Sequence, residues 1–180
     1  MSQRVKEWVV NDVMRMRVLT SVCQMDMPQA YVAAGFVRNM VWDHLHNKSV
    51  PTPLNDVDVI YFDPHEVEER RYLKCEHDLK ILMPGVNWQV RNQALMHLRN
   101  GDRPYKDVVD AMCYWPEKET AIAIRLLNNG QLECVSAFGF DSLFDLKLTH
   151  NPKRSKGVFK NRIQSKGWLS KWSKLDVVMN

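Results

Sequence analysis

The chain has 180 residues, of which 45% are apolar and 26% charged, a composition typical of a globular protein and not of a disordered one. This length suits one domain with its own core, and no apolar run is long enough to predict a membrane-spanning helix. The N-terminal residues lack the apolar stretch of a secretory signal, and the four cysteines form no C-x-x-C pair. We therefore expect a cytoplasmic protein with reduced thiols that does not enter a membrane.

The formal net charge of +4 is unevenly distributed along the chain. Nine of the 25 Lys and Arg residues lie at 147–174, where no Asp or Glu occurs. This distribution favours a surface near the C-terminus that faces a polyanion. A solvated basic tail would produce the same pattern, so both interpretations stay open.

The first half of the chain is predicted to alternate helices with strands. Helical spacing of apolar residues predicts helices, and short apolar runs predict buried strands. The predicted helices are 4–22, 37–46 and 66–82, and the predicted strands are 31–34 and 57–62. Gly35 follows the first strand directly, which indicates a tight turn into the next helix.

The second half of the chain is predicted to add a β-hairpin to this pattern. Its predicted elements are a strand at 88–91, a helix at 106–112, strands at 120–127 and 132–136, and a helical turn at 141–146. Asn129-Gly130 between the last two strands is typical of a hairpin turn. The order of elements predicts an α/β (α+β) fold whose sheet is mixed because of the hairpin.

Asp56 and Asp58 are the residues that point most directly to chemistry. Alternate residues of a strand project from the same face, so both carboxylates are expected to point together. Two carboxylates so close repel each other unless a cation neutralises them, and Mg²⁺ prefers such oxygen ligands. Bound Mg²⁺ can assist phosphoryl transfer. The D-x-D pattern alone is not specific, because metal-dependent glycosyltransferases use it too.

The turn at Gly35 is predicted to bind phosphate. A glycine between a strand and a helix allows a ligand close to the backbone, and the first amides of a helix attract anions. Arg38, one turn into the helix, could add a charge-assisted contact to a triphosphate. An ordinary glycine turn with Arg38 paired to a surface acid is the alternative interpretation.

Together, these segments resemble the head domain of the tRNA CCA-adding enzymes, which belong to the DNA polymerase β-type nucleotidyltransferase superfamily. Those heads contain Gly-Gly-x-Val-Arg-Asp, a helix, and then Asp-x-Asp. Here Ala34-Gly35-Phe36-Val37-Arg38-Asn39 and Asp56-Val57-Asp58 follow the same order. The chain also resembles a family of small, free-standing bacterial nucleotidyltransferase-like proteins. That resemblance continues through Trp88-Gln89-Val90-Arg91-Asn92-Gln93-Ala94-Leu95-Met96-His97, Trp115-Pro116-Glu117, Thr120, Arg125, Asp141-Ser142-Leu143-Phe144, Asn151-Pro152, Arg162, Lys166, Trp168 and Trp172.

The resemblance implies a mixed-sheet, polymerase β-type nucleotidyltransferase head with flanking helices. The head is expected to span residues 1–150, with 151–180 as a basic, aromatic-bearing segment packed on it or extending from it. It implies a Mg²⁺-dependent enzyme that transfers a nucleoside monophosphate from a nucleoside triphosphate (NTP) to an acceptor hydroxyl, of RNA or of another molecule. Asp56 and Asp58 would bind Mg²⁺, and the nucleotide would lie at Gly35, Phe36, Arg38 and Asn39.

The superfamily also uses a third carboxylate on a later strand beside the first two. Glu133 is the candidate, as catalytic residue and metal ligand, because a strand position can face the aspartates; Asp141 is the reserve. An exposed Glu133 on an edge strand is an equally good interpretation. Arg125, which lies among aliphatic residues of a predicted strand, is a second candidate phosphate ligand.

Three departures from the CCA-adding pattern bear on activity. Phe36 stands where a small residue is expected and could narrow the phosphate site, and Asn39 replaces an aspartate. The helical domains that select nucleotide and tRNA in those enzymes have no counterpart here, so CCA addition itself is not expected. A non-catalytic nucleotide- or RNA-binding module with the same fold is therefore the alternative function.

One polar segment further along the chain, Asn92, Gln93 and His97, is a secondary candidate. These side chains could approach a base or ribose. Hydrogen bonding within the protein is the simpler role for them.

Overall fold

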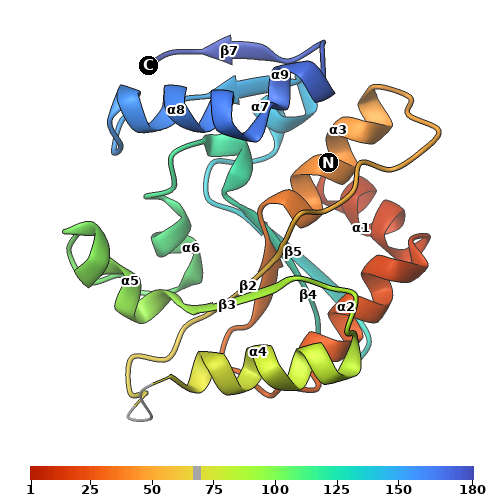
Figure 1. Cartoon of the computed structure of the whole chain (residues 1–180), viewed down its shortest axis with the longest axis vertical. Helices are drawn as coiled ribbons and strands as arrows, with labels where there is room; N and C mark the ends of the chain where they lie inside the picture. The colour runs from red at the N-terminus through yellow and green to blue at the C-terminus, as the bar shows by residue number, and fades with distance from the viewer. Residues whose placement is uncertain (67–69) are drawn as a thin grey trace.

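The computed structural model describes residues 1–66 and 70–180. Helices surround a central sheet, and short helical segments connect several of its strands (Figure 1). The helices are α1 (Ser2–Val10), α2 (Val13–Cys23), α3 (Gly35–Leu45), α4 (Arg71–Leu82), α5 (Gln93–Asn100), α6 (Val108–Met112), α7 (Asp141–Phe144), α8 (Lys156–Lys166) and α9 (Trp168–Lys171), with a 3-10 turn η1 (Lys118–Thr120). The strands are β1 (Tyr31–Ala33), β2 (Val57–Tyr61), β3 (Trp88–Asn92), β4 (Ile122–Leu126), β5 (Leu132–Ser136), β6 (Lys147–Thr149) and β7 (Asp176–Val178).

The central sheet is mixed, as the sequence predicts. Its strand order is β3-β2-β1-β4-β5, and β6 and β7 form a separate two-stranded sheet. Strand β2 pairs antiparallel with β1 and parallel with β3, whereas β4 and β5 form the predicted antiparallel hairpin. Asp58 lies opposite Ala33 on β1 and opposite Gln89 on β3. This register fixes which side chains share a face with Asp58.

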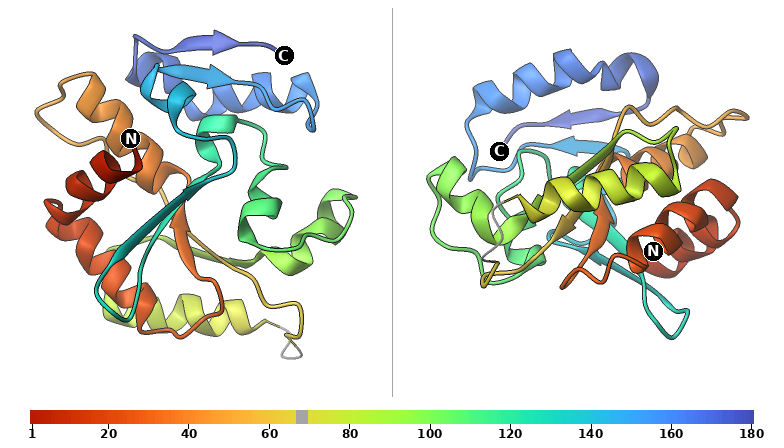
Figure 2. Two further views of the ribbon diagram at one scale, coloured as in Figure 1. Left: turned by 180° about the vertical axis from the view of Figure 1, so that it is seen from behind. Right: turned by 60° about the horizontal axis from the view of Figure 1, so that its bottom comes forward.

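The two faces of the sheet carry different cores. Val32, Val59 and Ile124 lie on the face that packs in the larger core, which also contains residues of α1 to α4 and of the C-terminal helices. Ala33 and Ala123 lie on the other face, in a smaller core formed with α6 and the start of α5. Figure 2 shows from behind that α1 and α2 lie on the opposite side of the strands from α5 and α6. Asp58 is on the second face.

The structure corrects several predicted bounds. The helix predicted at 4–22 is two helices, because the Asp12 side chain caps the start of α2 by accepting from the Arg15 N–H at 3.0 Å. The helix predicted from Glu66 begins at Arg71; Glu66 is not helical, and 67–69 lie outside the described residues. Helix α5 lies where the sequence predicts no helix or strand. Strands β6 and β7 were not predicted either, since each has three residues and pairs with a distant partner.

The C-terminal residues pack against the rest of the chain. Strand β7 pairs in parallel with β6, and Trp168 and Trp172 are buried in the larger core. Both tryptophan rings contact the Trp42 ring edge to face. The aromatic residues of the basic segment therefore stabilise the fold, while its charged residues face outward or into a cleft. Among the described residues, no helix has the length and apolarity needed to cross a bilayer.

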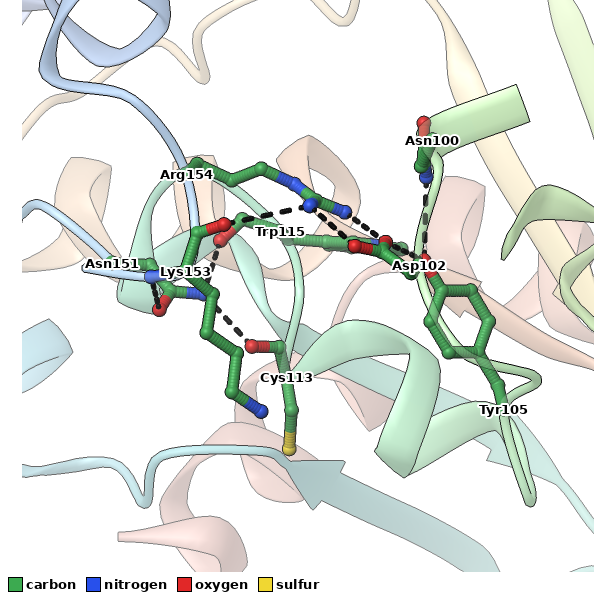
Figure 3. Close-up of polar contacts among 8 residues, drawn as sticks. All are labelled: Asn100, Asp102, Tyr105, Cys113, Trp115, Asn151, Lys153 and Arg154. Carbon is green, nitrogen blue, oxygen red and sulfur yellow. Dashed lines mark hydrogen bonds and ion pairs between the residues drawn. The ribbon is translucent and has the colours of Figure 1, made fainter. Parts of the chain in front are cut away.

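A polar cluster joins the end of α5 to the segment before α8 (Figure 3). Arg154 donates two hydrogen bonds to the Asp102 carboxylate, at 2.8 and 2.5 Å, and Tyr105 donates a third. The Asn151 amide donates to the carbonyl oxygens of Cys113 and Trp115 at 2.8 and 2.7 Å. These contacts hold the α5–α6 region and the C-terminal region at a fixed separation.

Candidate active site

A cleft of about 420 Å³ lies over the second face of the sheet, within the volume range typical of small-molecule sites. Its floor is formed by Ala34, Asp58, Ile60, Gln89 and Arg91. One wall consists of α5 with Trp115 and Pro116. The opposite wall consists of the start of α3, the loop before β2, and side chains of α8 and α9.

Both predicted metal-binding aspartates line this cleft. Asp58 lies within β2, but Asp56 lies in the loop before it, so the prediction that both are strand residues is correct only for Asp58. Burial, and next the nearby Asp56 charge, raise the pKa of Asp58 to about 6. The two carboxylates therefore share one site and repel each other, as expected of a pair that binds a cation.

The loop that bears Asp56 is held from both ends. The Asn87 amide donates to the Asn55 carbonyl oxygen at 3.0 Å. At the other end, the Asp43 carboxylate accepts from the N–H and hydroxyl of Thr52 at 2.7 and 2.6 Å, and from the Trp172 indole at 2.8 Å. The C-terminal segment thus helps to position this loop beside the cleft.

The start of α3 faces the same cleft. Val37 and Arg38 donate their N–H groups to the Ala34 carbonyl oxygen, at 3.2 and 2.9 Å. The preceding amides, of Gly35 and Phe36, have no intrahelical acceptor, as at any helix N-terminus. Gly35 lines the cleft, so this helix end can accept an anion there.

Ala34 makes this turn with a strained backbone. Its φ of 56° and ψ of −121° lie in a region that suits glycine, and the residue is buried. We expect Ala34→Val to lower the free energy of unfolding by about 2 kcal/mol or more, because a branched side chain adds strain and overpacking. Ala34→Gly is expected to stay within about 1 kcal/mol of wild type, since relief of strain offsets the lost methyl group. Urea unfolding of both variants checks this; equal destabilisation by both would contradict it.

Phe36 does not narrow the phosphate site, contrary to prediction. Its side chain is fully buried in the larger core, and its carbonyl oxygen accepts from Arg15 Nε at 3.0 Å. The small residue that opens the cleft is Gly35. A methyl group added at Gly35 would lie 3.5 Å from Asn39 Nδ2 and 3.7 Å from Arg38 Nη2. The turn, Arg38 and Asn39 are therefore neighbours.

Arg38 is a buried cation on the wall of the cleft. Its guanidinium donates to the Thr120 hydroxyl at 2.6 Å and to Asn39 Oδ1 at 3.0 Å, and it lies 4.6 Å from the centroid of the Trp168 ring. Burial lowers its pKa to about 10, so it stays charged at neutral pH. Its hydrogen-bond partners are neutral, and it forms no ion pair with any described residue, although the Glu117 and Asp58 carboxylates are close enough to favour its charged form. Its charge is thus available to an anion in the cleft.

The C-terminal helices supply three more cations to the cleft, namely Arg162, Lys166 and Lys171. The Arg162 Nε donates to Glu117 Oε1 at 2.5 Å, and Glu117 is fully buried. Arg91 and Arg99 also line the cleft, whereas Asp56 and Asp58 are the acidic residues in its described lining. The excess of positive charge favours a polyanionic ligand.

Glu133 and Arg125 do not lie at this site. Glu133 is on β5, and β1 and β4 separate that strand from β2. Its carboxylate accepts from Arg125 Nε at 2.5 Å and from the Tyr31 hydroxyl at 2.9 Å. Neither residue lines the cleft, and this position contradicts the prediction that Glu133 faces the aspartates. Asp141, the reserve, is exposed at the start of α7 and is not in the cleft lining either.

The strand beside Asp58 carries an amide in place of a third carboxylate. Gln89 on β3 is the register partner of Asp58 and lines the cleft. Within residues 1–66 and 70–180, no group of three His, Cys, Asp or Glu side chains could surround a metal ion. A cation at Asp56 and Asp58 would need its other ligands from water or substrate, which is usual for Mg²⁺.

The sequence did not single out the C-terminal cations as cleft residues. The acid-free segment 147–174 was a general signal of their presence. These cations reach the cleft because α8 and α9 pack beside α3. A local sequence pattern does not predict such packing between segments that are distant in the chain.

A mixed sheet with a carboxylate pair and a cationic helix end over one face is the arrangement expected of a nucleotidyltransferase. The profile of the nucleotidyltransferase family matches residues 20–177, so the chain belongs to this family. No curated protein matches it significantly.

Solved structures identify the fold more closely as that of the CCA-adding enzyme head domain. A protein whose NMR structure reveals a CCA-adding enzyme head domain is 27% identical, with a TM-score of 0.85, over 99% of this chain and 96% of that one. A CCA-adding enzyme in complex with CTP matches 96% of this chain with a TM-score of 0.63 and 14% identity. The match spans only 43% of that enzyme, which extends well beyond the shared fold.

Proposed function

We propose that this protein is a Mg²⁺-dependent nucleotidyltransferase that transfers a nucleoside monophosphate from an NTP to an acceptor hydroxyl. The observation that carries the proposal is one cleft containing both Asp56 and Asp58 and the start of α3. The similar fold of a CCA-adding enzyme in complex with CTP supports an NTP as the ligand. The acceptor is RNA or another hydroxyl-bearing molecule, and the four free cysteines agree with action in the cytoplasm.

The residues of the cleft fit Mg²⁺. Asp56 and Asp58 offer hard oxygen ligands, and the raised pKa of Asp58 reflects its burial and, next, repulsion by Asp56, which a bound cation would relieve. Mg²⁺ bound there would neutralise charge on the reacting phosphate. Arg38, Arg162 and the free amides at Gly35 would orient the rest of the triphosphate. The acceptor oxygen would form a bond to the α-phosphorus, the bond to the β-phosphate would break, and pyrophosphate would leave as the hydroxyl loses its proton.

Titration calorimetry with each NTP, with and without Mg²⁺, followed by a pyrophosphate-release assay, tests the proposal. Candidate acceptors include RNA oligonucleotides. We expect Mg²⁺-dependent NTP binding and pyrophosphate release that requires an acceptor. Absence of NTP binding would contradict the proposal.

A non-catalytic nucleotide- or RNA-binding module is the second candidate. The observation that favours it is Gln89, whose neutral amide lies beside Asp58 where a further carboxylate would assist the reaction. In this case the same experiments would detect NTP binding without pyrophosphate release for any acceptor.

Gly35 tests the phosphate contact directly. We expect Gly35→Ala to weaken NTP binding about tenfold, because the methyl group projects beside Arg38 where phosphate would approach the helix end. Stability should change by less than about 1 kcal/mol, since the added methyl meets ordinary contact distances. Gly85→Ala is the matched control, because its methyl would meet no atom within 4 Å and it lies outside the cleft lining. Unchanged NTP affinity in Gly35→Ala would contradict the assignment.

A further inference from the structure

Gln93, at the start of α5, is a largely buried residue whose side-chain amide has no hydrogen-bonding partner within residues 1–66 and 70–180. It is 5% exposed and lines the cleft. Its amide forms no hydrogen bond with any residue that the structure describes, although it has two donors and an acceptor. Gln89, on the neighbouring floor of the cleft, also has no partner among the described residues.

The other two polar residues of this segment, Asn92 and His97, make side-chain contacts within the protein and are not in the cleft lining. The Asn92 side chain caps α5 by accepting from the Ala94 N–H at 3.0 Å, and it also donates to the Asp63 carbonyl oxygen at 2.8 Å. His97 Nδ1 contacts the Ala94 carbonyl oxygen at 2.7 Å. Of the three residues of this segment, Gln93 is therefore the one whose side chain is free to bind a ligand in the cleft.

The amide atoms of Gln93 remain accessible from the cleft, because they are not among the fully enclosed, unpartnered polar atoms of the described residues. Such a group is expected at a site where a ligand supplies the missing partners. The surroundings of Gln93 indicate the kind of ligand. Met96 and Trp115 line the same wall, and both are partly buried hydrophobic residues. An apolar wall with an amide at its base suits the flat rings and polar edge of a nucleobase.

The spacing along β3 agrees with a nucleotide that spans the cleft. Gln89 is level with Asp58 in the sheet, and Gln93 follows four residues later. At about 3.3 Å per residue, their Cα atoms are roughly 13 Å apart. With phosphate at Asp58 and Arg38, this length leaves room for a ribose and a base before the amide of Gln93.

We propose that Gln93, assisted by Gln89, hydrogen-bonds the base edge of the NTP and that the α5 wall selects the nucleotide. This inference rests on the proposed function of the cleft. It assigns phosphate binding to the wall of α3, α8 and α9, and base recognition to the wall of α5. An amide offers a donor beside an acceptor, which matches the paired groups on the edge of a base.

The test compares the binding of NTPs with that of inorganic tripolyphosphate, which has no base, in the presence of Mg²⁺. Gln93→Leu is expected to weaken the best-bound NTP about tenfold or more and to leave tripolyphosphate affinity unchanged. Its melting temperature should stay close to that of wild type, because the Gln93 amide forms no hydrogen bond with the described residues that the substitution would remove. Gln93→Met is a second variant of similar length, and Gln24→Leu, exposed on the far side of the sheet, is the control.

Each outcome decides between the possibilities. Unchanged NTP affinity in Gln93→Leu and Gln93→Met, or an equal loss of NTP and tripolyphosphate, would overturn the assignment of Gln93 alone. A fall in melting temperature in both variants would also overturn it, since the amide would then have a structural role. If wild type binds neither NTP nor tripolyphosphate, the proposed function fails together with this inference.

Discussion

Asp58→Asn is expected to lower the rate of nucleotidyl transfer by about a thousandfold or more, because Mg²⁺ loses one of its two carboxylate ligands and the phosphate charge is no longer neutralised. The same variant should bind Mg²⁺ far more weakly in calorimetry. Asp56→Asn is expected to behave in the same way, since both side chains line the cleft. Retained turnover in the double variant would rule out the mechanism.

Asp58→Asn should raise the free energy of unfolding, although it lowers the rate of nucleotidyl transfer. The folded pKa of Asp58 is about 6, above its ordinary value of 3.8, so the folded state of wild type binds this proton more tightly than the unfolded state. Metal-free wild type therefore loses stability as the pH rises from about 4 to about 6, by an amount on the order of 2 kcal/mol. Asp58→Asn lacks this loss and should be more stable than metal-free wild type at pH 7.5.

Urea unfolding of both proteins between pH 4 and pH 8, without metal, measures this difference. Asp141→Asn is the matched control, because Asp141 is exposed and outside the cleft. A constant difference between Asp58→Asn and wild type over the whole range would show that Asp58 does not titrate as the structure indicates.

Arg162→Met is expected to destabilise the protein by about 3 kcal/mol, because it leaves the fully buried carboxylate of Glu117 without its cation. It should also weaken NTP binding about tenfold, since Arg162 lines the cleft. Arg17→Met, exposed on α2 and unpaired among the described residues, is the control and should change neither property.

A second substitution separates the two effects. Adding Glu117→Gln to Arg162→Met removes the unpaired charge and should restore most of the lost stability. NTP affinity should remain low, because the cation is still missing. Recovery of NTP affinity in the double variant would show that Arg162 acts only through the fold.

The sequence predicts the local parts of the site well. Residues 31–39 form a strand, a turn and a helix, and Asp58 lies on a strand, as the spacing of apolar residues indicates. Both segments depend on neighbouring residues alone. The family resemblance then predicts the fold, which the comparisons confirm.

The local sequence pattern does not predict the order of the strands in the sheet. Glu133 is in the predicted hairpin strand, but that strand forms the edge farthest from β3, with β1 and β4 between it and Asp58. Strands that follow one another in the chain need not be neighbours in the sheet. A local sequence pattern therefore identifies a strand but not the strands that lie beside it. The same limit applies to Arg162, which reaches the cleft through the packing of Trp168 and Trp172.

The contacts of Asp102 with Arg154, and of Asn151 with Cys113 and Trp115, join the two walls of the cleft (Figure 3). A nucleotide that touches both walls therefore meets a preassembled receptor, and its binding free energy is not spent on bringing them together. The junction also couples the walls thermodynamically: a ligand that requires a wider or narrower opening must strain this junction first. If the cleft binds a nucleotide as proposed, this junction would limit the size of the nucleotide without contacting it.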